Sequence, residues 1–576
     1  MSWEQKLGYL KTEKCLVGWR DRRDTGEVQP VLQLALGWLA GEEEVRVKEA
    51  AGECLGAVCA HYGLDLDNNC LPRVLQLART HLERKIEPDK EDAASGKLMD
   101  RKEWKNLAAW KDLDIVLSCL QIMLDSPVSR GNRNTDTEVL DLVITCLTHG
   151  NRFVRDSGYK TCASLLRSSS DQAGGENNLL RDQLSAGLSD SWAQVRLSAC
   201  QAAREFLLSM SASEREEHLP ALLPRLCLNR YFPAEAVRRQ AQAAWRAVCG
   251  DGGRDLLARH VTPAVEYYTA SARSDSPSVR EAACLSISEL VTKLDPATVC
   301  DSVPALLDSL SPEDSTWQVR DAASVAASCV IRHHPQHPHL AQHTVDTLLT
   351  IFLRHLQDPV SPVRQGAAVC LANTVRALGG KVLTAVTHSV REGLRALRDQ
   401  AEAGGSLEPW QVAEGSVHTV AELSKIKEHQ QVVSSLLPDI FQSCQYKHYP
   451  CYLQYCSTVC RRLAEIATNI DKRYFKPHLE LSVIFVCLEG DSPQATAAAG
   501  DCLKTLGRIL GPNILRGRVE NFNPNWLPLH DRVMSGASWE CLPTIARPIG
   551  SSQPIEIPRA NNCDAELPSL GGTPPT

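Results

Sequence analysis

The sequence predicts an all-α protein, an α-α superhelix or right-handed solenoid of about eleven two-helix repeats that ends in a disordered C-terminal tail. Three observations lead to this prediction. A short phrase recurs at nearly constant spacing along the 576 residues. No segment sustains the apolar–polar alternation of a half-buried strand. Aromatic residues make up only 5% of the chain, so Leu, Ala and Val must fill the core, which favours helices.

The recurring phrase is Val-Arg followed by a run of small apolar residues. Its arginines are Arg46, Arg155, Arg196, Arg238, Arg280, Arg320 and Arg364. From Arg155 to Arg364 they follow one another at steps of 40 to 44 residues. A constant period of this length predicts stacked helical units, each too small to bury its apolar face alone.

Two irregular gaps fit the same period. The step from Arg46 to Arg155 holds two periods and a surplus that matches the charged stretch at about 85–105, which we predict to be an inserted loop. After Arg364 the pattern returns three periods later, with Ala495 and Thr496 in place of Val-Arg. The interval holds two degenerate repeats, around 381–423 and 431–470. The total is eleven.

Each period predicts two helices. In the clearest second helix the apolar face is formed by Val363, Ala367, Cys370, Leu371 and Thr374. The turn before the second helix carries an acidic residue suited to capping it, and these residues are Asp190, Asp275, Asp314 and Asp358.

This pattern resembles the HEAT repeat of the HEAT/armadillo superfamily of α-solenoids, over roughly residues 26–511. The resemblance implies a structural ladder in which a turn aspartate and the arginine six residues later bridge neighbouring repeats. The residues concerned are Asp190 with Arg196, Asp314 with Arg320, and Asp358 with Arg364. Stacking of such units predicts a long concave surface lined by the second helices.

The chain divides into three parts on this interpretation. Residues 1–25 form an N-terminal capping helix, and residues 26–519 form the solenoid. Residues 520–576 form a Pro-rich C-terminal tail, largely disordered from about residue 547.

Composition narrows the partners and the compartment. A net charge of −7 argues against a nucleic-acid partner or an anionic membrane surface, and no apolar run is long enough to insert into a membrane. The 22 cysteines lie mostly in apolar helical stretches, and the N-terminus has no signal-peptide core. We therefore expect a cytoplasmic protein, with the nucleus as an open alternative.

Catalytic motifs for phosphate, dinucleotide, nucleophile-elbow or zinc-protease sites are missing, so we expect no enzyme activity and no cofactor. Two clusters leave a metal site as an alternative. The first is Cys329 with His333, His334, His337, His339 and His343, and the second is Cys444 with His448, Cys451, Cys456 and Cys460. Prolines in the first and helical spacing in the second favour a solvated loop and core cysteines instead.

Two aromatic groups are candidates for partner binding. Tyr446, Tyr449, Tyr452 and Tyr455 are followed by Arg461 and Arg462, residue types that dominate interface hot spots, although packing between repeats is the alternative for the tyrosines. Trp192 and Trp317 lie in turns before Val-Arg, as in the TOG domains that bind tubulin, although they would also cover the edge of the solenoid.

The sequence predicts, from all of these features, a non-catalytic scaffold or adaptor that uses the solenoid surface to assemble, chaperone or transport a protein partner. A TOG-like protein that binds tubulin or microtubules is the first alternative. A zinc-binding solenoid or an enzyme is the second.

Overall fold

The computed structural model describes residues 1–20, 26, 28–41, 43–62, 70–83, 101–125, 133–168, 177–340, 342–403, 410–447, 449 and 451–536. This part of the chain contains helices and no strand. Most of the inserted loop predicted at about 85–105 lies outside the described residues, because the next helix begins at Arg101. The predicted disorder from about residue 547 lies outside them as well.

Eleven consecutive helix pairs can be traced in the described residues, as the sequence period predicts. The first helices of the pairs are α2 (Gln29–Ala40), α4 (Cys70–Glu83), α6 (Arg133–Leu147), α8 (Asn177–Leu188), α10 (Ala212–Asn229), α13 (Val261–Ser271), α16 (Val303–Ser309), α18 (Gln342–His355), α20 (Gly380–Ala403), α22 (Gln430–Ser443) and α25 (Ser482–Glu489). The second helices are α3 (Val45–Tyr62), α5 (Arg101–Leu124), α7 (Arg152–Ser168), α9 (Ala193–Leu208), α11 (Glu235–Cys249), α14 (Pro277–Lys293), α17 (Trp317–His333), α19 (Ser361–Leu378), α21 (Trp410–Ser424), α23 (Tyr452–Asn469) and α26 (Pro493–Leu510).

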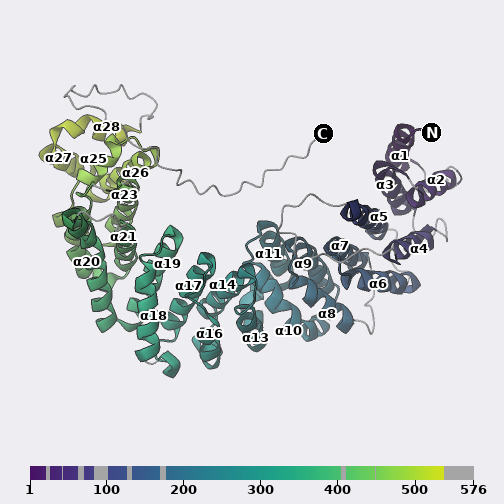
Figure 1. Cartoon of the computed structure of the whole chain (residues 1–576), viewed down its shortest axis with the longest axis horizontal. Coiled ribbons are helices and arrows are strands. Elements are labelled where there is room, and N and C mark those ends of the chain that lie inside the picture. The colour runs from purple at the N-terminus through teal and green to yellow at the C-terminus, as the bar shows by residue number, and fades with distance from the viewer. Residues whose placement is uncertain are drawn as a thin grey trace.

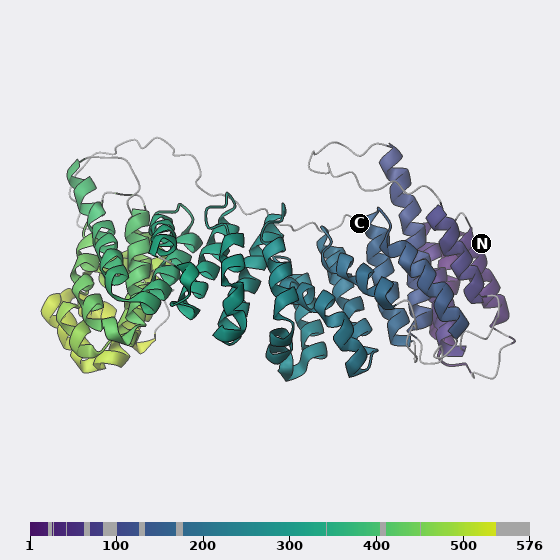
Figure 2. The ribbon, with the colours of Figure 1, turned by 90° about the horizontal axis from the view of Figure 1, so that it is seen from below.

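The pairs form an open arc of two layers. The second helices line the inner, concave side of the arc and the first helices form its outer side (Figure 1). Figure 2 shows the pairs stacked in chain order along the long axis. Three short helices lie between pairs: α12 (Gly253–Arg259), α15 (Pro296–Val299) and α24 (Lys472–Phe475).

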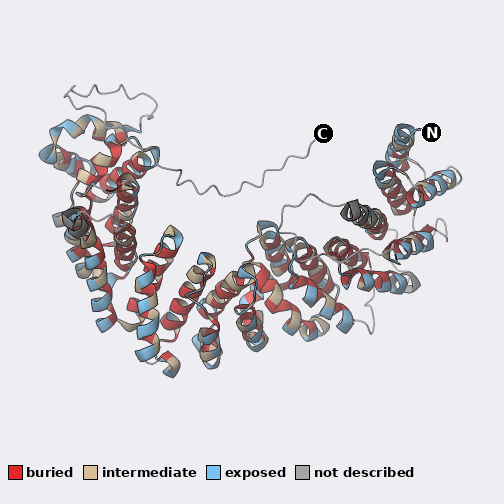
Figure 3. Cartoon of the chain, viewed as in Figure 1, coloured by how far each residue is buried: buried red, intermediate tan, exposed pale blue. Residues whose placement is uncertain are grey.

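The core runs between the two layers along the whole arc (Figure 3). Val363, Ala367, Cys370, Leu371 and Thr374 of α19 are all buried, as their helical spacing predicts. Small residues on the inner helices let neighbouring helices approach closely. Fifteen of the twenty described cysteines are buried, and none of the twenty is in a disulfide.

Additional helices cover both ends of the stack. α1 (Trp3–Val17) packs on α3, and α27 (Pro512–Phe522) and α28 (Leu527–Ser535) pack on α26. The helical part therefore continues past the boundary that the sequence placed at residue 519. Prolines suggested a tail there, but Pro528 stands in the first turn of α28, where a helix needs no N–H donor. No helix in the described residues is long and apolar enough to cross a membrane.

Candidate binding site on the concave face

In the repeats that carry the Val-Arg phrase from Arg155 to Arg364, the turn before the inner helix positions the arginine of that helix. Arg155 donates to the carbonyl oxygens of His149 and Gly150, at 3.0 and 3.1 Å. Arg320 donates in the same way to the carbonyls of Asp314 and Ser315, at 2.9 and 2.8 Å. Each arginine thus satisfies carbonyl groups of its own turn that no helix bond can reach.

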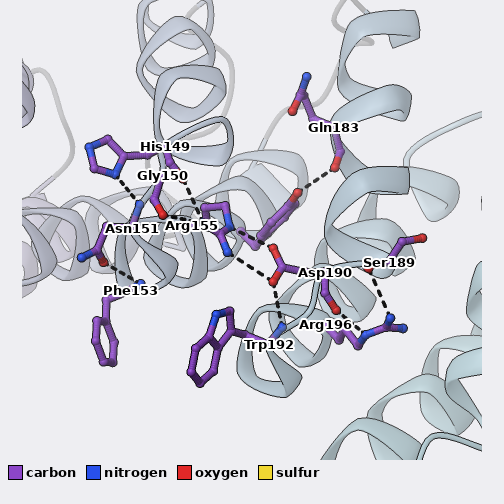
Figure 4. A network of polar contacts seen from close by, with 11 residues as sticks. His149, Gly150, Asn151, Phe153, Arg155, Gln183, Ser189, Asp190, Trp192 and Arg196 are labelled. Atoms are coloured by element: carbon purple, nitrogen blue, oxygen red, sulfur yellow. Dashed lines mark hydrogen bonds and ion pairs between the residues drawn. The ribbon is translucent and has the colours of Figure 1, made fainter. Parts of the chain in front are cut away.

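The same arginines also reach the aspartate in the turn of the next repeat. Arg155 pairs with both carboxylate oxygens of Asp190 (Figure 4), at 2.9 and 3.2 Å. Arg280 pairs with Asp314 at 3.0 and 3.2 Å, and Arg320 pairs with Asp358 at 2.9 Å. These side chains are less than one-fifth exposed, so the pairs are stronger than surface ion pairs.

Each of the three aspartates also holds its own turn. Asp190 accepts from the backbone N–H of Trp192, Asp314 from that of Thr316, and Asp358 from that of Val360, at 2.8–2.9 Å. Asp275 departs from the predicted capping role: in that turn Ser274 accepts from the N–H of Ser276 instead. The reason is register, because Ser274 and not Asp275 stands six residues before Arg280.

Three arginines vary this arrangement. Arg196 is buried and donates to Asn229 Oδ1 at 2.9 Å and to carbonyls of its own turn (Figure 4 shows the turn). Arg364 is buried and pairs with the buried Glu414 of α21. For Arg238, the described residues show hydrogen bonds to the carbonyls of Phe232 and Pro233 and no carboxylate within ion-pair distance.

A polar pocket opens on three consecutive inner helices beyond this ladder. Its cavity of about 330 Å³ is lined by Ser361 and Gln365 of α19, Glu414 and His418 of α21, and Gln454, Thr458, Arg461, Arg462 and Glu465 of α23. These residues recur at helical spacing, so each helix presents one polar stripe to the pocket. All three helices belong to the inner layer of the arc.

Hydrogen bonds fix the floor of the pocket. Glu414 accepts from Arg364 on one side and from Thr458 Oγ1 on the other, the latter at 2.9 Å. Arg462 Nε donates to His418 Nδ1 at 2.8 Å. Burial and then the charges of Arg462, Arg364 and Arg461 lower the pKa of His418 to about 3, so its ring is neutral at pH 7.

The tyrosine group is largely buried, which corrects the hypothesis of a partner-binding patch. Tyr455 is fully buried, Tyr449 and Tyr452 are 9% exposed, and Tyr446 is half-buried. Tyr452 and Tyr455 donate or share hydrogen bonds with Cys444 and Ser443 across the repeat. They pack between α22 and α23, whereas Arg461 and Arg462 belong to the pocket.

The tryptophans lie at the edge of the arc, where the inner helices begin. Trp192 and Trp317 are 39% and 36% exposed. The guanidinium of Arg152 stacks 3.5 Å from the ring centre of Trp192. That contact gives Trp192 a packing role at the edge of the solenoid.

The two candidate metal clusters show no metal-binding geometry. Among the described residues, no three His, Cys, Asp or Glu side chains are grouped so that they could hold a metal ion. This covers the cluster from Cys329 to His343 and the second cluster except His448, which lies outside the described residues. Burial raises the pKa of Cys200 and Cys284 to about 12, so these two thiols are poor nucleophiles.

Sequence reasoning missed Glu414 and His418, which build the floor of the pocket. Both lie in a repeat without the Val-Arg phrase. A signal was present: they stand four residues apart, on one helix face, in a run of otherwise small and apolar residues.

The stacked pairs and their turn arginines define an α-solenoid, the fold that the sequence period predicts. Comparison with solved structures finds similar chains among karyopherins. Yeast importin-β (Kap95p) is 14% identical with a TM-score of 0.39, and the match covers 88% of this chain and 66% of that one. Kap121p bound to RanGTP is 12% identical with a TM-score of 0.42, over 88% and 53% of the two chains. This chain thus spans about half to two-thirds of their length.

A further solved structure, of Kap95p with RanGDP, is 14% identical with a TM-score of 0.43 and matches 88% of this chain and 65% of that one. No protein-family model matches the chain, and no curated protein matches it. The fold assignment therefore stands on the helix pairs themselves.

Proposed function

We propose that this chain is a non-catalytic scaffold or adaptor that binds a protein partner along its concave face. The pocket across α19, α21 and α23 carries the proposal, because it is a preformed polar recess on the face that the stacked inner helices present. Assembling, chaperoning or transporting the partner would each use such a surface.

The mode of binding follows from the architecture. A stack of repeats offers many small contacts spread over a long surface, so affinity is the sum of weak interactions with an extended partner. The free cysteines of the described residues support a reducing compartment, the cytoplasm or the nucleus. The stacking of Arg152 on Trp192 gives that residue a packing role, so it lends no support to the tubulin alternative.

Photo-crosslinking in cells tests the proposal. A photoreactive amino acid replaces Gln365 of α19 or Gln454 of α23, both exposed and both in the pocket. Matched positions on the outer side are Glu217 of α10 and Thr350 of α18, also exposed. We expect a defined crosslinked partner from the inner positions only. Equal crosslinking from both sides would contradict a concave binding face.

A further inference from the structure

The pocket across α19, α21 and α23 has an uneven balance of donors and acceptors. Two of its charged groups are internally neutralised: Glu414 by Arg364 beneath it, and Glu465 by Arg462 at 2.7 Å. Arg461 is different. It is exposed, its one hydrogen bond is to Thr458 Oγ1 at 3.3 Å, and no described carboxylate lies within ion-pair distance. The pocket therefore keeps one unneutralised positive charge.

His418 adds a donor to this charge. Because its Nδ1 accepts from Arg462, the ring proton of the neutral imidazole is on Nε2. The side chain is 3% exposed, and its Nε2 has no hydrogen-bond partner among the described residues. A buried N–H without an acceptor is costly, so a ligand oxygen that enters the pocket and approaches it gains more than it would on the surface.

The remaining lining groups suit the same kind of ligand. Ser361, Gln365 and Gln454 supply neutral hydroxyl and amide donors at the rim. The cavity of about 330 Å³ is several times the roughly 30 Å³ share of one water molecule, so it has room for a side chain and its hydration.

We propose that this pocket binds a carboxylate of the protein partner, an Asp or Glu side chain or a C-terminal carboxylate in an extended segment, with Arg461 as its charged ligand. This rests on the proposed protein-binding function and specifies the chemistry of one subsite. The net charge of the whole chain is −7, so it repels acidic segments in general. The segment that binds should therefore carry one acidic anchor among neutral or basic residues.

Fluorescence anisotropy with the purified full-length chain tests this. The probes are rhodamine-labelled short peptides in matched pairs that differ only by Glu against Gln. Among the peptides that bind, we expect the Glu member of each pair to bind about tenfold more tightly than the Gln member. Arg461→Gln should abolish that preference. Arg508→Gln is the matched control, because Arg508 of α26 is also exposed and also donates to a threonine three residues earlier.

Each other outcome overturns the proposal in a recognisable way. Equal binding of the Glu and Gln peptides would show that no carboxylate is recognised. An unchanged preference in Arg461→Gln would show that the carboxylate binds outside this pocket. If free glutarate saturates the pocket at the same concentration as the peptide, the pocket is a site for a small molecule. Absence of peptide binding, with crosslinks still formed from Gln454, would overturn the carboxylate subsite and leave the protein-binding function standing.

Discussion

The junction between α14 and α17 and the junction between α11 and α14 are consecutive along the solenoid, yet they are held differently. At the first, Arg280 makes two hydrogen bonds with the carboxylate of Asp314, and the two inner helices pack closely. At the second, Arg238 bonds only to carbonyls of its own turn among the described residues. Every other successive pair of inner helices packs closely, but α11 and α14 do not.

The difference in ion pairing comes from one position in the sequence. The turn before α17 has Asp314 six residues before its arginine, whereas the turn before α14 has Ser274 at that place. Ser274 still closes the turn but cannot neutralise Arg238. The outer helix α10, which packs on α13 and contacts α14, holds this junction instead. At this junction the described residues show neither an ion pair between the turns nor close packing of the two inner helices.

The largest effect is expected where the pairing is most buried. Glu414→Ala should lower the free energy of unfolding by about 3–5 kcal/mol, because it leaves Arg364 buried without a counter-charge. Urea denaturation measures the loss. Glu422→Ala, which removes the pair with the partly exposed Lys425 just after the same helix, should cost less than about 1 kcal/mol. Similar losses in the two variants would mean that burial of the pair does not matter.

The closely packed junction between α14 and α17 also contains a group that lowers the free energy of unfolding. Burial, and then the charges of Glu281 and Asp358, raise the pKa of Asp321 on α17 to about 6, and its Oδ1 has no hydrogen-bond partner among the described residues. Ionised Asp321 therefore destabilises the fold at pH 7. Asp321→Asn should stabilise it by about 2 kcal/mol at pH 7. Because the folded state takes up the proton first, this gain should shrink as the pH falls below 6 and vanish near pH 4. Thermal melts of both proteins across that range check the sign, and a gain that grows in acid would refute it.

Removal of one of the partly exposed Arg–Asp pairs between turns should lower the free energy of unfolding by less than removal of Glu414. Asp314→Ala loses the pair with Arg280 and the bond from Thr316 N–H, at an expected cost of about 2 kcal/mol. Asp275 is exposed and stands one residue after the position that pairs with the arginine of the preceding repeat. Asp275→Ala should therefore cost less than about 0.5 kcal/mol. Burial alone would raise the pKa of Asp314, but bonds from Thr316 N–H and Arg280 lower it below its ordinary value, so the stability it contributes should decrease as the pH falls below about 4. A cost that does not decrease in acid would contradict this account.

The smallest effect is a gain at the weaker junction. Ser274→Asp places a carboxylate at the missing rung and should add about 0.5–1 kcal/mol of stability. Hydrogen exchange in α11 and α14 should become slower as the junction closes more firmly. Arg238→Gln in the same background should abolish both changes. If exchange slows equally in that double variant, the added side chain does not act through Arg238.

The repeating part of the fold was predictable because one phrase encodes one unit. The spacing of the arginines predicts eleven pairs, and small apolar residues such as Ala367 and Cys370 predict the buried face of α19. The pocket was not predictable in the same way, because Glu414 and His418 lie in a repeat without the phrase. The number of tyrosines near Tyr452 suggested a surface, but Tyr452, Tyr455 and Val459 share one helix face with buried cysteines. Their periodicity was the better guide than their chemical type.

The weaker junction has a mechanical consequence. It lies near the middle of the described chain, with closely packed inner helices on each side. Rotation there swings both arms as rigid levers, so a small change of angle at α11 and α14 becomes a large change in the span between the tips. The distance between the two ends of the arc would then change, while the pocket on one arm would keep its geometry.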